Sequence, residues 1–85
     1  MTVLSKLRSM PDERIQDWLS KVGVDRVRDL EIALMGADEE VKDSVYRNMS
    51  ERASSALRAD MKKLATRKIK EGEILAKAKS LESLL

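Results

Sequence analysis

The side chains of this 85-residue chain that could do chemistry are carboxylates, ammonium groups and guanidinium groups, because the chain contains no His and no Cys. Without His it lacks the usual general base and the commonest zinc ligand, and without Cys it lacks disulfides and thiolate metal sites. Basic residues number 17 and acidic residues 15, for a net charge of +2. The chemistry that these groups favour is electrostatic recognition of a partner.

The acidic residues do not suggest a catalytic pair. Asp38, Glu39 and Glu40 are adjacent, but acids in such a run are typical of a helix start, where they cap free N–H groups and face the positive end of the dipole. Glu71 and Glu73 lie two residues apart and would not face each other on a helix. No Ser has a His to activate it, and no Gly-rich phosphate loop is present. We therefore expect no enzyme, and no cofactor, metal or small-molecule substrate.

Residues 50–64 predict a helix with charges along its outer side. Residues repeat at about 100° around a helix, which gathers the apolar residues of this segment on one side. These are Ala53, Leu57, Met61 and Leu64. Arg52 and Lys63 lie on the opposite side with Ala59, and Asp60 lies at the boundary. The simpler interpretation is a solvated helix face without a binding role, and the more specific one is a docking strip for a charged partner.

A basic cluster follows at the end of this segment. It consists of Lys62, Lys63, Arg67, Lys68 and Lys70. Clustered cations neutralise phosphates, so a small nucleic-acid-binding domain is an alternative. Two observations disfavour it: the cluster has no aromatic side chain for base stacking, and the chain as a whole is nearly neutral.

The elements that must position these charges are helices. Apolar residues recur with helical spacing, no strand-length alternation occurs, and there is no Asn-Gly or Asp-Gly hairpin signal. Trp18 and Tyr46 are the only aromatic residues, and we expect both in the core, with the Tyr46 hydroxyl reaching the rim. The fold class is all-α, a compact bundle of about six short helices in one domain over residues 1–85. No apolar run is long enough for a membrane span, and no signal peptide opens the chain.

Start and stop signals divide the chain into these helices. The first is short and carries Val3, Leu4, Leu7 and Met10. The expected starts of the next five are Pro11 in a first turn and Asp25, Asp38, Ser50 and Thr66 as caps, with stops at Gly23 and Gly36. Val27 is expected to be buried in the third helix and Leu75 in the last. Gly72 inside the last helix is expected to be a soft point.

Residues 33–61, ALMGADEEVKDSVYRNMSERASSALRADM, resemble the C-terminal domain of the bacterial flagellar motor switch protein FliG. That family typically reads ALKGA, then a short acidic helix, then NMS-RA and LR-D. The matching positions are Ala33 to Ala37, Asn48 to Ser50, Arg52 with Ala53, and Leu57 with Arg58 and Asp60. Residues 1–16 resemble the family's hinge and first helices, and the match over the final 20 residues is loose.

The resemblance implies an all-helical unit at the rim of the cytoplasmic switch ring, on the cytoplasmic face of the flagellar basal body. One helix, residues 50–64 here, presents charges to the cytoplasmic loop of the stator protein MotA, and torque passes through that contact. This implies protein-binding roles for Arg52, Asp60 and Lys68, with Arg58 and Lys63 nearby. Other switch-ring proteins are implied as partners in the full-length context.

The chain departs from the family pattern at several positions. Met35 replaces a basic residue, Ala59 replaces the first of two adjacent acids, and Thr2 and Leu4 replace two hinge phenylalanines. Residues 64–66 replace a Gly-Pro turn, and the family's N-terminal and middle domains are missing. The chain is therefore either an excised domain or a free-standing FliG-like protein. Its lost charges also favour an alternative, a structural or adaptor module with a changed protein partner.

Overall fold

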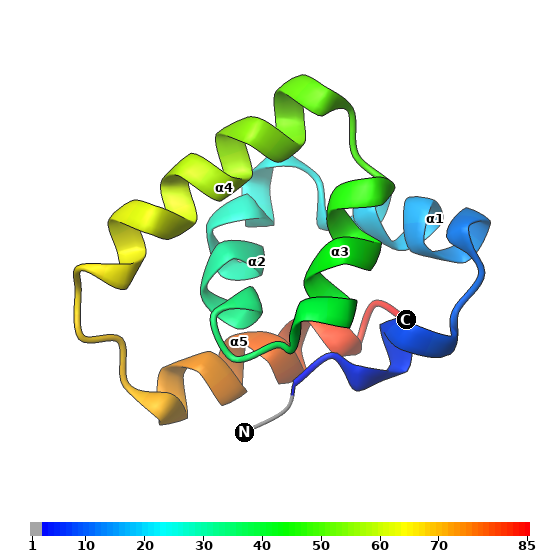
Figure 1. Ribbon diagram of the computed structural model, residues 1–85. Coiled ribbons are helices and arrows are strands. Elements are labelled where there is room, and N and C mark those ends of the chain that lie inside the picture. Colours follow the sequence, from blue (N-terminus) through cyan, green and yellow to red (C-terminus); the bar gives the residue numbers. More distant parts are fainter. Residues whose placement is uncertain (1–2) are drawn as a thin grey trace.

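The computed structural model describes residues 3–85, and in this range the chain forms five α-helices and two short 3₁₀-helices (Figure 1). The elements are η1 (Ser5–Ser9), α1 (Asp12–Val22), η2 (Val24–Arg26), α2 (Val27–Leu34), α3 (Glu39–Arg47), α4 (Glu51–Ala65) and α5 (Glu71–Glu82). The all-helical class is confirmed. The expected count of about six is corrected to five α-helices, because the first expected helix is only the 3₁₀ segment η1. Thr2 lies outside the described residues.

The centre of the bundle is α2, which lies between α4 and α5 (Figure 1). All five residues from Leu30 to Leu34 are buried, so this part of the helix is covered on every side rather than along one stripe. Its most extensive contact is with α5, and an ion pair between Lys77 and Asp29, 3.3 Å long, joins the two helices. The helix α4, which carries the charged residues predicted for segment 50–64, therefore packs on the buried helix α2.

The first and last parts of the described chain are tied together at the end of α5. Trp18 is 1% exposed, and its indole N–H donates a hydrogen bond to the Leu81 carbonyl over 2.9 Å, which confirms its expected place in the core. The backbone N–H of Leu4 donates to Glu82 Oε1 over 3.2 Å. Leu4 is fully buried and has a φ of 57°, an uncommon left-handed conformation for a residue with a side chain.

Two predicted helix caps are confirmed. The Asp38 carboxylate accepts a hydrogen bond from the N–H of Val41 over 3.0 Å, at the start of α3. The Ser50 hydroxyl accepts from the N–H of Ala53 over 3.2 Å, at the start of α4. Both caps satisfy N–H groups that have no partner within the first helical turn.

Two other predicted caps are wrong. Asp25 lies inside η2, and α2 begins two residues later without a side-chain cap. Thr66 ends α4 instead of starting the next helix, because its hydroxyl donates back to the Lys63 carbonyl over 2.7 Å. The Thr66 hydroxyl thus forms a local bond to the backbone that competes with capping, as short hydroxyl side chains can. As a result α5 begins only at Glu71.

Other start and burial predictions also need correction. Pro11 precedes α1 as its N-cap rather than lying in its first turn. Gly23 ends α1 with the expected positive φ of 59°, but its ψ of −175° is extended rather than left-handed helical. Val27 and Leu75 are 36% and 47% exposed, because α2 and α5 turn these positions away from the shared core. The predicted stop near Gly36 is close to the observed end of α2 at Leu34.

Candidate functional site

The charged helix α4 is held in place by a buried apolar stripe. Leu57, Met61 and Leu64 are 2%, 8% and 5% exposed, and Ala53 is half-buried. On the opposite side Arg52 and Lys63 are exposed, as expected. The stripe orients the helix, so its outer charges face solvent along a rigid element rather than on a loop.

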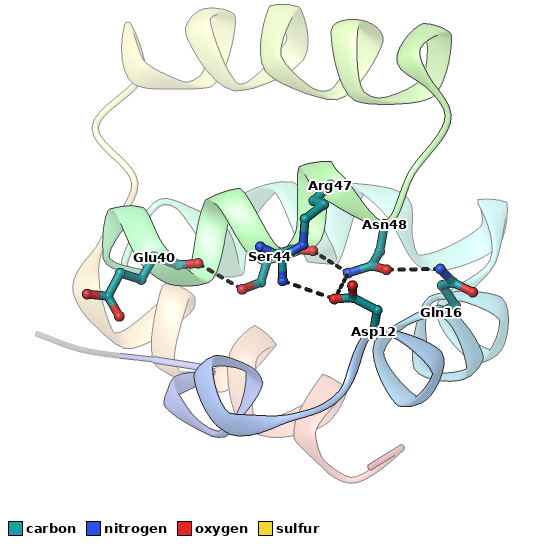
Figure 2. A network of polar contacts seen from close by, with 6 residues as sticks. All are labelled: Asp12, Gln16, Glu40, Ser44, Arg47 and Asn48. Carbon is teal, nitrogen blue, oxygen red and sulfur yellow. Dashed lines mark hydrogen bonds and ion pairs between the residues drawn. The ribbon is translucent and has the colours of Figure 1, made fainter.

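A polar network fixes the turn that leads into α4 (Figure 2). The Asn48 amide nitrogen donates to the Ser44 carbonyl over 2.8 Å and to Asp12 Oδ1 over 3.2 Å. The Asn48 amide oxygen accepts from the Gln16 amide over 3.0 Å, and Arg47 donates to the same Asp12 oxygen over 3.0 Å. The hydrogen bond from Asn48, and then that from Arg47, lower the pKa of Asp12. The network thus links α1 to α3 and to the turn that precedes α4.

Arg58 lies on the edge of α4 that faces α3. Its guanidinium carbon is 4.4 Å from the centre of the Tyr46 ring, a cation–π contact. Tyr46 is half-buried, and its hydroxyl donates to the Met61 sulfur over 3.4 Å. Burial raises the pKa of Tyr46, and the charge of Arg58 opposes that rise. Arg58 therefore serves the fold on this edge as well as adding to the charged surface.

Asp60 lies on the other edge, beside Glu31, a residue that the sequence pattern did not predict to be part of the site. Glu31 of α2 is only 3% exposed. Burial first, and then the hydrogen bond with Asp60 and the charge of Asp60, raise the pKa of Glu31 to about 7, and the charge of Arg28 opposes the rise. The Arg28 Nε lies 3.7 Å from Glu31 Oε1. The Glu31 carboxyl thus keeps its proton far above the ordinary range, and it can donate that proton to Asp60.

Three of the five predicted site residues gather at the end of α4, and two do not. Asp60 and Lys63 line a cavity of about 130 Å³ together with Glu31 and two arginines, Arg28 and Arg67. Lys68 lies in the link that follows α4, in an adjacent hollow that shares the two arginines. Arg52 stands near the start of α4, and Arg58 turns toward α3. The predicted residues are therefore spread over different edges of α4 and the link that follows it, rather than gathered in one pocket.

The described residues do not assemble a metal centre. Among residues 3–85, no three acidic side chains are grouped so that they could hold a metal ion. Within the same range, no helix has both the length and the apolar character that a bilayer crossing requires. The fold and the site together define a small helical domain that displays charge on one surface helix.

Known proteins place this domain in a family. The model of the FliG C-terminal domain family matches residues 1–82, so the chain belongs to that family. Among curated proteins, the flagellar motor switch protein FliG of Thermotoga maritima is 33% identical over 73 residues, and that of Pseudomonas aeruginosa is 36% identical over 73 residues. Each alignment covers 86% of this chain and 21% of the relative, so the chain spans about a fifth of their length. No solved structure gives a significant match.

Proposed function

We propose that this chain is a non-enzymatic component of a flagellar motor switch, and that α4 binds the cytoplasmic loop of a MotA-type stator protein. The observation that carries the proposal is the exposed charge on α4, a helix capped by Ser50 and seated by a buried stripe. Membership of the FliG C-terminal domain family supports it. The proposed place of action is the cytoplasmic face of the basal body, beside the other switch-ring proteins.

Weak electrostatic contacts of this kind suit a motor in which one partner moves past the other in steps and must release after each step. Exposed ion pairs contribute only about 0–1 kcal/mol each, and salt largely screens exposed charges that are more than about 8–10 Å apart. Arg52, Lys63 and Lys68 are all exposed, so each can form and release a pair as the partner passes. Because α4 is a rigid helix, the charges on it keep a fixed spacing, and binding does not incur the entropy cost of ordering a flexible loop at every encounter.

The departures from the family pattern predict a change in the partner. Met35 is half-buried against the core, and Ala59 on the outer face of α4 is uncharged. Only Asp60 supplies negative charge among the proposed contact residues, beside Arg52, Arg58, Lys63 and Lys68. We infer that the partner loop is more acidic than one that faces two adjacent acids.

The test is the affinity of the purified stator loop from the same organism for the Arg52→Glu/Asp60→Lys variant. We expect a loss of about tenfold at low salt, because two weak pairs become repulsive. The matched control, Glu71→Lys/Lys79→Glu on α5, reverses two exposed charges away from α4 and keeps the same net charge. Equal binding by both variants would refute the proposed role of α4.

A second candidate is an adaptor that keeps the fold but binds a different protein, and the uncharged Met35 and Ala59 favour it. Self-association is its simplest form. Light scattering over a concentration series separates the two: a mass that grows with concentration supports self-association, and a constant monomer mass excludes it.

A further inference from the structure

An apolar groove runs between α4 and the segment that joins α1 to α2. Its volume is about 390 Å³, and its walls come from the end of α1, from η2, from α2 and from the middle of α4. The apolar walls include Leu19, Val22, Val24, Val27, Ala53 and Leu57. The groove lies on the α2-facing edge of α4, and neither Arg52 nor Lys63 lines it.

Exposed apolar side chains border this groove. Among residues 3–85, the large apolar side chains that are exposed are Val24 at 88%, Val27 at 36% and Leu75 at 47%. The two valines line the groove, and Leu75 does not. Apolar surface left in water beside a concave apolar wall marks an interaction site, because covering it releases the water from both.

The groove has charge at only one place. Its charged lining residues are Glu31 and Asp60, and both are acidic. The basic neighbours of this pair do not line the groove: Arg28 is 3.7 Å from Glu31, and Lys63 and Arg67 line the smaller cavity that shares the two acids. On the groove side, therefore, an acidic wall faces an apolar channel without a cation of its own.

We propose that this groove binds an amphipathic helix of a partner protein, whose apolar side chains fill the channel and whose lysine or arginine reaches the wall formed by Glu31 and Asp60. A helix is the fitting occupant because the groove lies between helices and residues 3–85 contain no strand edge for a peptide to extend. The inference goes beyond the proposed function, since the groove shares only Asp60 with the proposed stator contact and does not require the partner to be a stator.

The buried acid gives the proposed contact a pH signature. Glu31 is faced by Arg28 of its own helix, by Asp60 and Lys63 of α4, and by Arg67 beyond the end of α4. Its pKa of about 7 means that it holds a proton near neutrality. A cation from the partner favours the ionised carboxyl, so binding releases that proton. Affinity for a helix with a cation should therefore rise as the pH rises through about 7.

The experiment titrates the isotope-labelled protein with two synthetic amphipathic peptides of about four helical turns, followed by NMR. One carries a single lysine at the end of its apolar stripe, and the other carries glutamine there. We expect amide shifts centred on Val24 and Ala53, and about tenfold tighter binding of the lysine peptide at high pH. Val24→Ser should weaken both peptides. Glu31→Gln should abolish the rise in affinity between about pH 6 and pH 8.

Leu75→Ser is the matched control, since it removes an exposed apolar side chain outside the groove. Shifts on another face, equal affinity for the two peptides, or equal effects of Val24→Ser and Leu75→Ser would each overturn the proposal. Arg52→Glu separates the two hypotheses, because it should impair stator-loop binding but not peptide binding. Sedimentation of the chain alone should give a monomer, and a dimer that Val24→Ser dissociates would identify a second copy as the occupant instead.

Discussion

The two edges of α4 differ in how completely their polar groups find partners and their apolar surface is covered by the rest of the chain. On the edge toward α3, Arg58 covers the Tyr46 ring, and the Asn48 network ties the preceding turn to α1. On the edge toward α2, two acids lie side by side and an open apolar groove runs along the helix. One edge is closed by contacts within the chain, and the other keeps an open apolar surface beside two neighbouring acids.

This difference indicates that one edge of the helix stabilises the fold and that the other is available to bind a partner. The closed edge contributes stability, because its donors and acceptors have partners at ordinary hydrogen-bond distances. The open edge costs stability, because a buried carboxyl is held against a second one. Groups that weaken a fold are frequently those that a ligand uses. Three substitutions test whether the two edges are as unequal as the structure indicates.

The largest effect is expected from Leu57→Ala, in the buried stripe that both edges share. Leu57 is 2% exposed, and loss of a buried leucine typically costs about 2–5 kcal/mol of unfolding free energy. Urea denaturation followed by circular dichroism measures it. The neighbouring exposed change Ala56→Ser is the control and should stay within about 0.5 kcal/mol of the wild type. If Leu57→Ala is as mild as this control, α4 is not held by its stripe.

The second effect concerns the open edge and depends on pH. The pKa of Glu31 is about 7 in the fold against an ordinary 4.5, so the unfolded chain releases this proton first. Wild-type stability should therefore fall as the pH rises between these two values. Glu31→Gln removes that loss, and at pH 8 the variant should be more stable by about 1–3 kcal/mol. At about pH 4 the two proteins should be equal.

Unfolding free energies from urea titrations across this range provide the check. Glu73→Gln, at an exposed position on α5, is the control and should leave the profile unchanged. Parallel pH profiles for the wild type and Glu31→Gln would mean that the two acids do not strain the open edge.

The smallest effect is expected from Asn48→Ala on the closed edge. It removes three hydrogen bonds of a half-buried side chain, and we expect a loss of about 1–2 kcal/mol. It also removes the main cause of the lowered pKa of Asp12. Stability tied to a lowered carboxyl pKa is present above the ordinary range and is lost as the pH falls, so the variant should be less sensitive to acid.

Thermal unfolding between about pH 3 and pH 7 measures both consequences. Gln16→Ala, which removes only one hydrogen bond to Asn48, should lie between the wild type and Asn48→Ala. An Asn48→Ala variant with wild-type stability would show that the closed edge does not depend on this network.

Local signals in the sequence predicted those parts of the fold that depend on neighbouring residues. The caps at Asp38 and Ser50 are confirmed because a short polar side chain and the next turn are all that a cap needs. Asp25 and Thr66 are also residue types that can cap, but Asp25 lies inside η2 and the Thr66 hydroxyl bonds back to the Lys63 carbonyl at the end of α4. Val27 and Leu75 were placed inward because periodicity identifies an apolar stripe but not its exact edges.

The candidate site likewise has features that local sequence patterns predict and others that they do not. The exposure of Arg52 and Lys63 followed from the periodicity of α4, but the partner of Asp60 did not. Glu31 is 29 positions away in the sequence and lies on another helix, so no spacing within α4 could identify it. A signal was nevertheless present: Glu31 interrupts an apolar run, Leu30 to Leu34, in which all residues are buried. A lone acid in such a run indicates a charged group enclosed by the fold.

The last turn of α5 holds both the Leu4 amide and the Trp18 indole. Tension applied at residue 3 and at residue 85 would therefore meet within a few residues, at Leu81 and Glu82. The shortest route by which force would pass from residue 3 to residue 85 runs through these contacts and does not include α4. A pull on the polypeptide from either side would leave the displayed helix mechanically undisturbed until this junction ruptured.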